Sequence, residues 1–190
     1  TSHYPRGGDA YYVFNAEKSK NIKVRYPNVT YSTIGDNGAE VKTKIDIEAT
    51  VTLMDVKKVE HYMNFTGIKT AYLALSKKSI GGAAKVDMVN LSEVHITYKY
   101  FKAGTNEPIT ISSNTTYGDI DWNQAMGFHY EKFGKVYVTS NSKLYFTKAG
   151  AGGKYKTIYD AKGSVAKGEK DLPYATSFTF SSPYADIAYV

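Results

Sequence analysis

Hydrophobic and polar residues alternate along much of the chain, most regularly over residues 41–53. In that segment aliphatic residues and one threonine at odd positions are separated by Lys, Asp, Glu and Thr at even positions. A period of two held this long predicts an extended, half-buried β-strand. Residues 22–31 alternate in the same way, and the intervening turn contains Asp36, Asn37 and Gly38, residue types that accept positive φ. The two segments are therefore expected to form a β-hairpin.

A second strongly alternating segment covers residues 91–101, where Val94, Ile96 and Tyr98 share one face and His95 lies on the other. The Gly- and Pro-containing turn at 103–108 leads into residues 109–112, and this arrangement predicts another hairpin. About ten strands and no long helix are expected. The remaining predicted strands are 70–75, 134–140, 143–147, 154–159, 176–180 and 186–190.

Short strands joined by turns predict an all-β fold, with two antiparallel sheets packed face to face as a β-sandwich, as in jelly-roll-like folds. The weakly patterned segments 56–67 and 77–89 are expected to be long crossing loops, with or without a helical turn. No repeat or low-complexity linker divides the sequence, so residues 1–190 are expected to form one domain.

The composition narrows the classes of function. The chain has no cysteine, which excludes disulfides, thiolate metal sites and cysteine nucleophiles. Its net charge is +6, but only Arg6 and Arg25 are arginines and the lysines are scattered, which disfavours nucleic-acid binding. No apolar run is long enough to predict membrane insertion. The sequence begins without Met or a signal-peptide pattern, and it is expected to be a monomeric part of a larger exported multidomain chain.

The most unusual segment is 117–124, which combines two carboxylates, an amide and the only Trp. Asp119 and Asp121, with Asn123, present oxygen ligands at alternate positions and are candidates for a Ca²⁺ site. The Gly and distal Glu of an EF-hand are absent. The alternative is that these side chains accept hydrogen bonds from backbone amides and close a turn.

Ligand-binding candidates lie in the same segment and in the Tyr- and Gly-rich stretch that follows it. Trp122 and Asn123 offer a stacking surface and an amide, whereas the alternative role of Trp122 is a core residue between the sheets. Tyr130 and Tyr155 flank flexible loops, as tyrosines do in many recognition surfaces, although most tyrosines in strands are ordinary sheet residues.

No motif in the sequence indicates catalysis or nucleotide binding. The glycine groups lack the spacing of phosphate-binding loops, and the four histidines are far apart in the sequence. A glycosidase carboxylate pair leaves no local signature, so a carbohydrate-binding module of a glycan-active enzyme stays an alternative. We nevertheless expect a non-enzymatic protein.

Two runs of sequence resemble the ligand-binding modules of Gram-positive, cell-wall-anchored fibrillar adhesins. The first run is VRYPNVTY at 24–31, followed by a Gly-containing turn and VKTKIDIEATVT at 41–52. The second run is VHITYKYF at 94–101, followed by GTNEPI at 104–109 and GDID at 118–121. The order of these motifs is similar to the CshA-type non-repetitive region and, more distantly, to glucan-binding and antigen I/II variable-region modules.

This resemblance implies a lectin-like sandwich displayed outside the cell on the bacterial wall, which attaches to a host matrix protein or glycan. It carries over no catalytic residue. The sequence also departs from the family pattern, because Trp122 and Asn123 replace a usual Gly-Gly after the acidic triplet. The alternative function is a structural stalk or spacer domain of a surface protein. An internal isopeptide bond between Lys and Asn or Asp is a further property of some such sandwiches.

Overall fold

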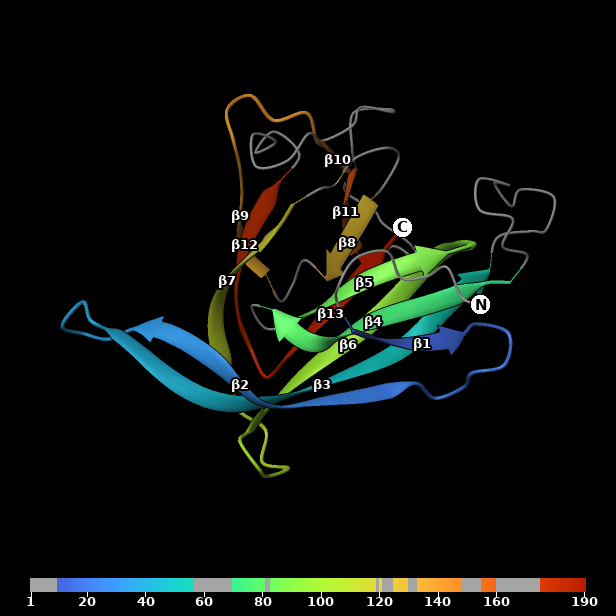
Figure 1. Cartoon of the computed structure of the whole chain (residues 1–190). Helices are drawn as coiled ribbons and strands as arrows, with labels where there is room; N and C mark the ends of the chain where they lie inside the picture. The colour runs from blue at the N-terminus through green and yellow to red at the C-terminus, as the bar shows by residue number, and fades with distance from the viewer. Residues whose placement is uncertain are drawn as a thin grey trace.

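The computed structural model describes residues 10–56, 70–80, 83–118, 120, 125–129, 133–147, 155–159 and 175–190. Within these ranges the chain forms thirteen β-strands and no helix (Figure 1). All of the strand pairs are antiparallel. The predicted all-β fold is therefore confirmed.

The strands form one large sheet and two small ones. The large sheet has seven strands in the order β10-β11-β8-β13-β6-β3-β2. Its members are β2 (Lys23–Ile34), β3 (Glu40–Val56), β6 (Leu91–Lys102), β8 (Ala125–His129), β10 (Tyr145–Thr147), β11 (Tyr155–Tyr159) and β13 (Tyr184–Tyr189).

Each small sheet has three strands. The first small sheet has the order β1-β4-β5, with β1 at Tyr11–Asn15, β4 at Tyr72–Ile80 and β5 at Ala83–Val89. The second small sheet has the order β7-β12-β9, with β7 at Ile111–Tyr117, β12 at Thr176–Ser182 and β9 at Phe133–Val138.

Both small sheets cover the same face of the large sheet. Tyr26 and Tyr100 both pair with Ile47, so their side chains share one face. The Tyr26 hydroxyl donates to the Ser76 carbonyl in the first small sheet at 2.9 Å. The Tyr100 ring stacks on Phe180 of the second small sheet with 6.0 Å between centroids. The molecule is thus compatible with a β-sandwich, and one of its two layers consists of two separate sheets.

A continuous hydrophobic core fills the space between the layers. Ile47 of the large sheet, Leu73 of the first small sheet and Phe178 of the second are fully buried in the same cluster. Burial of each such side chain stabilises the fold by roughly 1.5–3 kcal/mol. The alternating pattern of the strands produces this core, because every second side chain points toward the opposite layer.

The predicted hairpin at 22–53 is confirmed as β2 and β3, which project beyond the rest of the sheet (Figure 1). Ile45 and Ile47 are buried, whereas Val41 lies on the projecting part and is exposed. Leu53 was expected on the buried face but is exposed. The pairing with β6 shifts by one residue between Val51 and Leu53, so Leu53 lies opposite His95 on the outer face.

The hairpin predicted across residues 91–112 forms only next to its turn. β6 forms as expected, but β7 pairs with β12 in the second small sheet. The two sides of the turn are joined by the bridge between Phe101 and Pro108, where the Lys102 amide donates to the Glu107 carbonyl and the Ile109 amide to the Tyr100 carbonyl. From Lys99 to Val94 the strand β13 occupies this side of β6, so the chain after Ile109 crosses to the other layer.

Two further expectations about strands and loops need correction, and a third falls mainly outside the described ranges. Residues 77–89 were predicted as a loop, yet they contain the end of β4 and all of β5. The strands β1 (YYVFN) and β8 (AMGFH) were not predicted, because their residues do not alternate between apolar and polar. The other predicted loop, 56–67, falls mainly on residues 57–69, which lie outside the described ranges.

A buried aspartate fixes the turn between the layers. Asp46 lies on the outer face of β3, where its side chain is only 7% exposed. It accepts hydrogen bonds from the Asn28 amide at 2.9 Å and the Gly104 amide at 3.2 Å, and the Arg25 guanidinium lies 3.2 Å away. Arg25 also donates to the Thr105 carbonyl. These contacts join β2, β3 and the turn that follows β6.

Candidate functional site

Most of the residues predicted to bind ligand or metal lie outside the described ranges. These residues are Asp119, Asp121, Trp122, Asn123 and Tyr130. Tyr155 begins β11, where its backbone lies opposite His129, and its side chain is not described. Their proposed roles, including Ca²⁺ binding, therefore stay predictions.

The described neighbours of the Trp122 segment are core residues. The Tyr117 ring stacks on Phe178 with 5.4 Å between centroids, and its hydroxyl lies 3.5 Å from that of Tyr189. Ile120 is buried. Residues 118–124 thus follow Tyr117, whose side chain packs against the core, and lead in sequence from β7 of the second small sheet to β8 of the large sheet.

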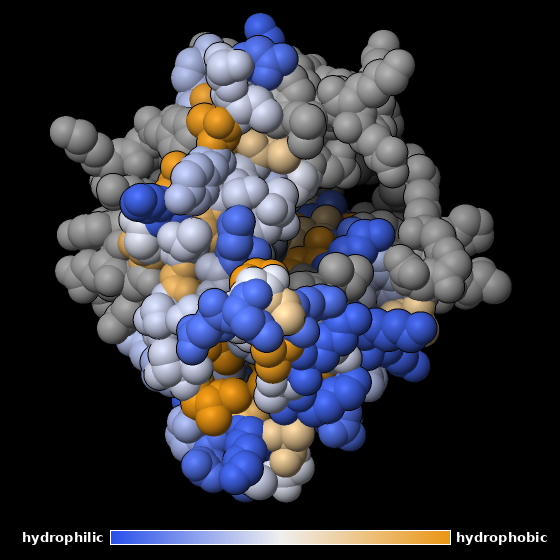
Figure 2. Space-filling model, turned by 90° about the vertical axis from the view of Figure 1, so that its left-hand side faces the viewer, coloured by the Kyte–Doolittle hydropathy of each residue, from blue (hydrophilic) through white to orange (hydrophobic). Residues whose placement is uncertain are grey.

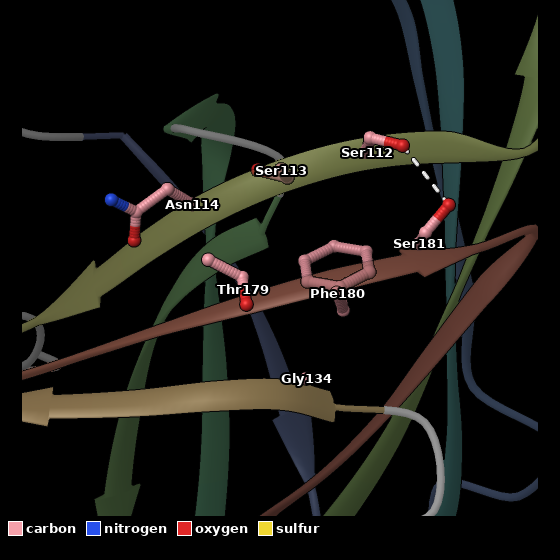
Figure 3. Close-up of a pocket in the computed structure, with 7 residues that line it drawn as sticks. All are labelled: Ser112, Ser113, Asn114, Gly134, Thr179, Phe180 and Ser181. Carbon is pink, nitrogen blue, oxygen red and sulfur yellow. Dashed lines mark hydrogen bonds between the residues drawn. The ribbon is translucent and has the colours of Figure 1, made fainter.

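A shallow groove lies on the second small sheet. The depression has a volume of about 420 Å³ and opens to solvent. It is lined by Ser112, Ser113, Asn114, Gly134, Thr179, Phe180 and Ser181 (Figure 3). The lining residues come from all three strands of that sheet, which are far apart in the sequence. We refer to this site as the polar groove.

Alternation along the strands places hydroxyl groups in the polar groove. In β12, Phe178 and Phe180 are buried, so the intervening Thr179 points to the other face. Thr179 lies opposite Asn114 of β7, and Ser181 lies opposite Ser112. The side chains of Ser112, Asn114, Thr179 and Ser181 point toward the same side of the sheet in Figure 3.

The hydroxyl groups form cross-strand pairs. The Oγ atoms of Ser112 and Ser181 are 2.9 Å apart (Figure 3), and those of Thr116 and Ser177 are 2.7 Å apart. Each hydroxyl has one donor and two acceptor positions, so a pair that shares one proton can still bond to a ligand. The pairing also orients the oxygens before a ligand binds.

Gly134 leaves the space that deepens the groove. A Cβ atom at this position would lie 2.9 Å from the Thr179 Oγ1 atom. The Lys135 amide donates to that same oxygen at 3.0 Å. A side chain at 134 would therefore crowd the hydroxyl and disturb the contact between β9 and β12.

The lining of the polar groove contains no ionisable side chain. Asn114 is exposed and provides amide donors and an acceptor. Such a lining suits a neutral ligand rich in hydroxyl or amide groups.

An exposed aromatic ring lies at one end of the same face. Tyr137 of β9 pairs with Ser177, which in turn pairs with Thr116. The Tyr137 side chain is therefore on the groove side, and it is 49% exposed. Figure 2 shows the side of the molecule on which this sheet lies, with pale, weakly polar atoms in its upper part and small, separate apolar groups.

The sequence analysis did not identify the polar groove. Residues 176–180 were correctly predicted as a strand, and the alternation of Ser and Thr with Phe was visible there. The groove, however, requires β7, β12 and β9 to be neighbours, and the predicted pairing of β7 was wrong. The one available signal was the density of hydroxyl residues in 112–117 and 176–182.

Two further observations on the described residues concern metal ions and membrane-spanning helices. In the described ranges, no group of three or more His, Asp or Glu side chains is placed to hold a metal ion. No helix of sufficient length and apolarity to cross a membrane occurs in the same ranges.

Comparisons of the chain with protein-family models, with curated proteins and with solved structures gave no match.

Proposed function

We propose that this chain is a non-enzymatic adhesin domain of a Gram-positive surface protein, which attaches to a host glycan or matrix protein through the polar groove. The observation that carries this proposal is the array of oriented hydroxyl groups and the Asn114 amide on an exposed sheet face without ionisable groups in the lining. The resemblance of the 24–52 and 94–121 segments to fibrillar adhesins supports the cellular context.

The chemistry of the groove favours recognition. Hydroxyl and amide groups form hydrogen bonds with sugar hydroxyls or peptide groups, each contributing about 0.5–1.5 kcal/mol net. Tyr137 provides an exposed ring at the end of the array, on which the apolar face of a sugar or a side chain can pack. Several such contacts together give a specific but shallow binding surface, as an adhesin needs.

The proposed location is the extracellular side of the bacterial wall, with anchoring by regions outside this sequence. Ca²⁺ bound by Asp119 and Asp121 is part of the proposal only as a second contribution to binding, beside the polar groove. The two contributions can be separated, because chelation removes the ion and leaves the groove hydroxyls unchanged.

The test is binding of the purified chain to arrays of host matrix proteins and glycans, at low and physiological salt, with and without chelator. We expect a ligand that stays bound at physiological salt, because neutral hydrogen bonds are not screened. Asn114→Ala should weaken that binding by roughly threefold to tenfold, the equivalent of one hydrogen bond.

Thr43→Ala is the matched control, since Thr43 is an exposed strand residue on the projecting hairpin. It should bind like the unmodified chain. Binding only to acidic polymers, lost when salt is added, would indicate lysine electrostatics and contradict the proposal. A specific ligand whose affinity is equal for both variants would place the binding site elsewhere.

A further inference from the structure

The turn between β2 and β3 contains the only Asn-Gly pair in the chain, Asn37-Gly38. It lies at the tip of the hairpin that projects beyond the rest of the large sheet (Figure 1). Both residues are exposed, as are Asp36 and Ala39 beside them. The side-chain amide of Asn37 is therefore accessible to solvent water.

Local hydrogen bonds hold this turn. The Gly38 amide donates to the Gly35 carbonyl and the Gly35 amide donates to the Ala39 carbonyl, both at 2.8 Å. Asn37 Oδ1 accepts from the Ala39 amide at 3.0 Å. Gly38 has a φ of 77°, as the last residue of a hairpin loop of this kind requires. All of these bonds lie within residues 35–39, so the turn can open while the core stays folded.

An exposed asparagine followed by glycine is reactive toward its own backbone. The Gly38 nitrogen can reach the Asn37 Cγ atom by rotation about the bonds of Asn37. A Cβ atom on the following residue would hinder that approach, and glycine has none. In the closed turn the Gly38 amide is bonded to the Gly35 carbonyl, so the attack takes place when the turn opens.

We propose that Asn37 is a modification site, at which the chain deamidates spontaneously and the hairpin tip becomes more acidic. The Gly38 nitrogen attacks Asn37 Cγ and forms a cyclic imide. The bond between Cγ and Nδ2 breaks, and ammonia leaves with the proton of the Gly38 amide. Water then opens the imide. Cleavage of the new bond to Cγ gives aspartate, and cleavage of the original peptide bond gives isoaspartate. Water is the only co-reactant.

The two products change the hairpin tip in different ways. Aspartate leaves the backbone unchanged, and its carboxylate can still accept the hydrogen bond from the Ala39 amide. Isoaspartate adds a methylene group to the backbone and lengthens the loop. Because loop length determines hairpin register, the pair next to the turn, Ile34 and Glu40, is then expected to open. Either product lowers the formal net charge from +6 to +5, since a neutral amide becomes a carboxylate.

Asn106 provides a comparison within the same chain. It is also exposed in a turn, but the next residue is Glu107. The side chain of Glu107 hinders attack by its own nitrogen, and the Glu107 amide donates to Thr105 Oγ1 at 3.1 Å. We therefore expect Asn106 to stay unmodified during the time in which Asn37 reacts.

The test is incubation of the purified chain in a mildly alkaline buffer, which favours loss of the amide proton. Isoelectric focusing should show a band that is more acidic by one charge and grows with time. Peptide mapping with electron-transfer fragmentation should place aspartate and isoaspartate at position 37 and find Asn106 intact. An Asn37→Gln variant should keep the original band, because glutamine would have to form a larger ring. The same acidic band in that variant, or equal conversion of Asn106, would contradict the proposal.

Gly38→Ala separates the attack by residue 38 from the opening of the turn. A Cβ atom at this position meets no heavy atom of the surrounding structure within 4 Å, but the positive φ strains alanine, so the turn opens more often. Slower deamidation in this variant would support the proposed attack, and equal or faster deamidation would overturn it.

A free peptide of residues 33–41 measures the reaction in the absence of the fold. We expect Asn37 to react in both molecules, and more slowly in the chain, because only the open turn is reactive. If the peptide were fully converted while Asn37 of the chain stayed intact, the hairpin would protect this residue and the proposal would be wrong.

Discussion

Asp46 illustrates how a single polar residue is stabilised in an unexpected place. The alternation of 41–53 placed it on the polar face of a strand, where exposure is the normal outcome. In the structure Arg25, the Asn28 amide and the Gly104 amide surround it. The Gly104 partner is 58 residues away in sequence, so strand periodicity alone contains no information about that contact.

The hydrogen bonds also determine the ionisation of this side chain. Burial by itself would raise the pKa of Asp46, but the bonds from the Asn28 amide, Arg25 and the Gly104 amide outweigh that effect. The pKa of Asp46 is therefore below its ordinary value. Its ionised form is stabilised in the folded chain relative to the unfolded chain.

The residue-scale prediction concerns Asp46→Asn. The substitution retains the shape but removes the charge that three donors contact, so we expect a loss of roughly 1.5–3 kcal/mol in the free energy of unfolding. Because the folded pKa is lowered, the stabilising effect of Asp46 is complete above about pH 4 and is lost as pH falls through the folded pKa. Urea unfolding at neutral and acidic pH measures both effects.

Asp36→Asn is the control, because Asp36 is exposed in the hairpin turn. It should change the free energy of unfolding little at neutral pH. If Asp46→Asn were equally mild at neutral pH, or if its destabilisation were as large at pH 2 as at pH 7, the stabilising role of the Asp46 carboxylate would be wrong.

At the scale of elements, the strands that the sequence predicted correctly are those with long alternation. β2, β3 and β6 have twelve or more residues each, which is enough to distinguish a period of two from other patterns. Which strands pair with each other was harder to predict from the sequence. The turn after β6 has ordinary hairpin residues, and local sequence contains no information that β13, far along the chain, occupies the side of β6 on which β7 would otherwise pair.

The element-scale prediction concerns the contact between β9 and β12. Gly134→Ala introduces a Cβ atom 2.9 Å from Thr179 Oγ1, closer than such atoms normally approach. We expect about 1–3 kcal/mol of destabilisation from overpacking, together with weaker ligand binding in the polar groove. Chemical denaturation and the binding assay described above measure the two effects.

Gly118→Ala is the matched control, since a Cβ at Gly118 has no heavy atom within 4 Å and its φ lies outside the positive range. It should be nearly neutral in both assays. If the Gly134→Ala variant were as stable as the Gly118→Ala variant, β9 would be able to move without a loss in the free energy of unfolding. The close approach of β9 and β12 at Gly134 would then make no contribution to stability.

At the scale of the whole molecule, buried tyrosines link the layers. The hydroxyls of Tyr98 and Tyr189 are 3.1 Å apart, and Tyr117 of the second small sheet approaches Tyr189 from the other layer. Burial raises the pKa of Tyr117 and Tyr189 well above the ordinary value, and burial likewise raises the pKa of Tyr100. The composition revealed the abundance of tyrosine, but only the assembled layers determine which hydroxyls lose solvent.

The whole-molecule prediction is cooperative unfolding in alkali. Because the folded pKa of these tyrosines is raised, their neutral form contributes stability that is complete below about pH 10 and is lost as pH rises further. Phenolate absorbance should therefore show one part that rises gradually near pH 10 and a second, steep part that coincides with loss of β-sheet circular dichroism. Fully gradual ionisation while the sheet signal persists would contradict the burial of this group.

The position of the last strand has a mechanical consequence. β13 lies between β6 and β8, with antiparallel hydrogen bonds to both neighbours. A force that pulls Val190 along the strand axis is therefore resisted by two ladders loaded in shear, whose bonds share the load instead of opening one after another. For the adhesin role proposed above, this arrangement makes the resistance of the domain to a pulling force depend on many hydrogen bonds at the same time.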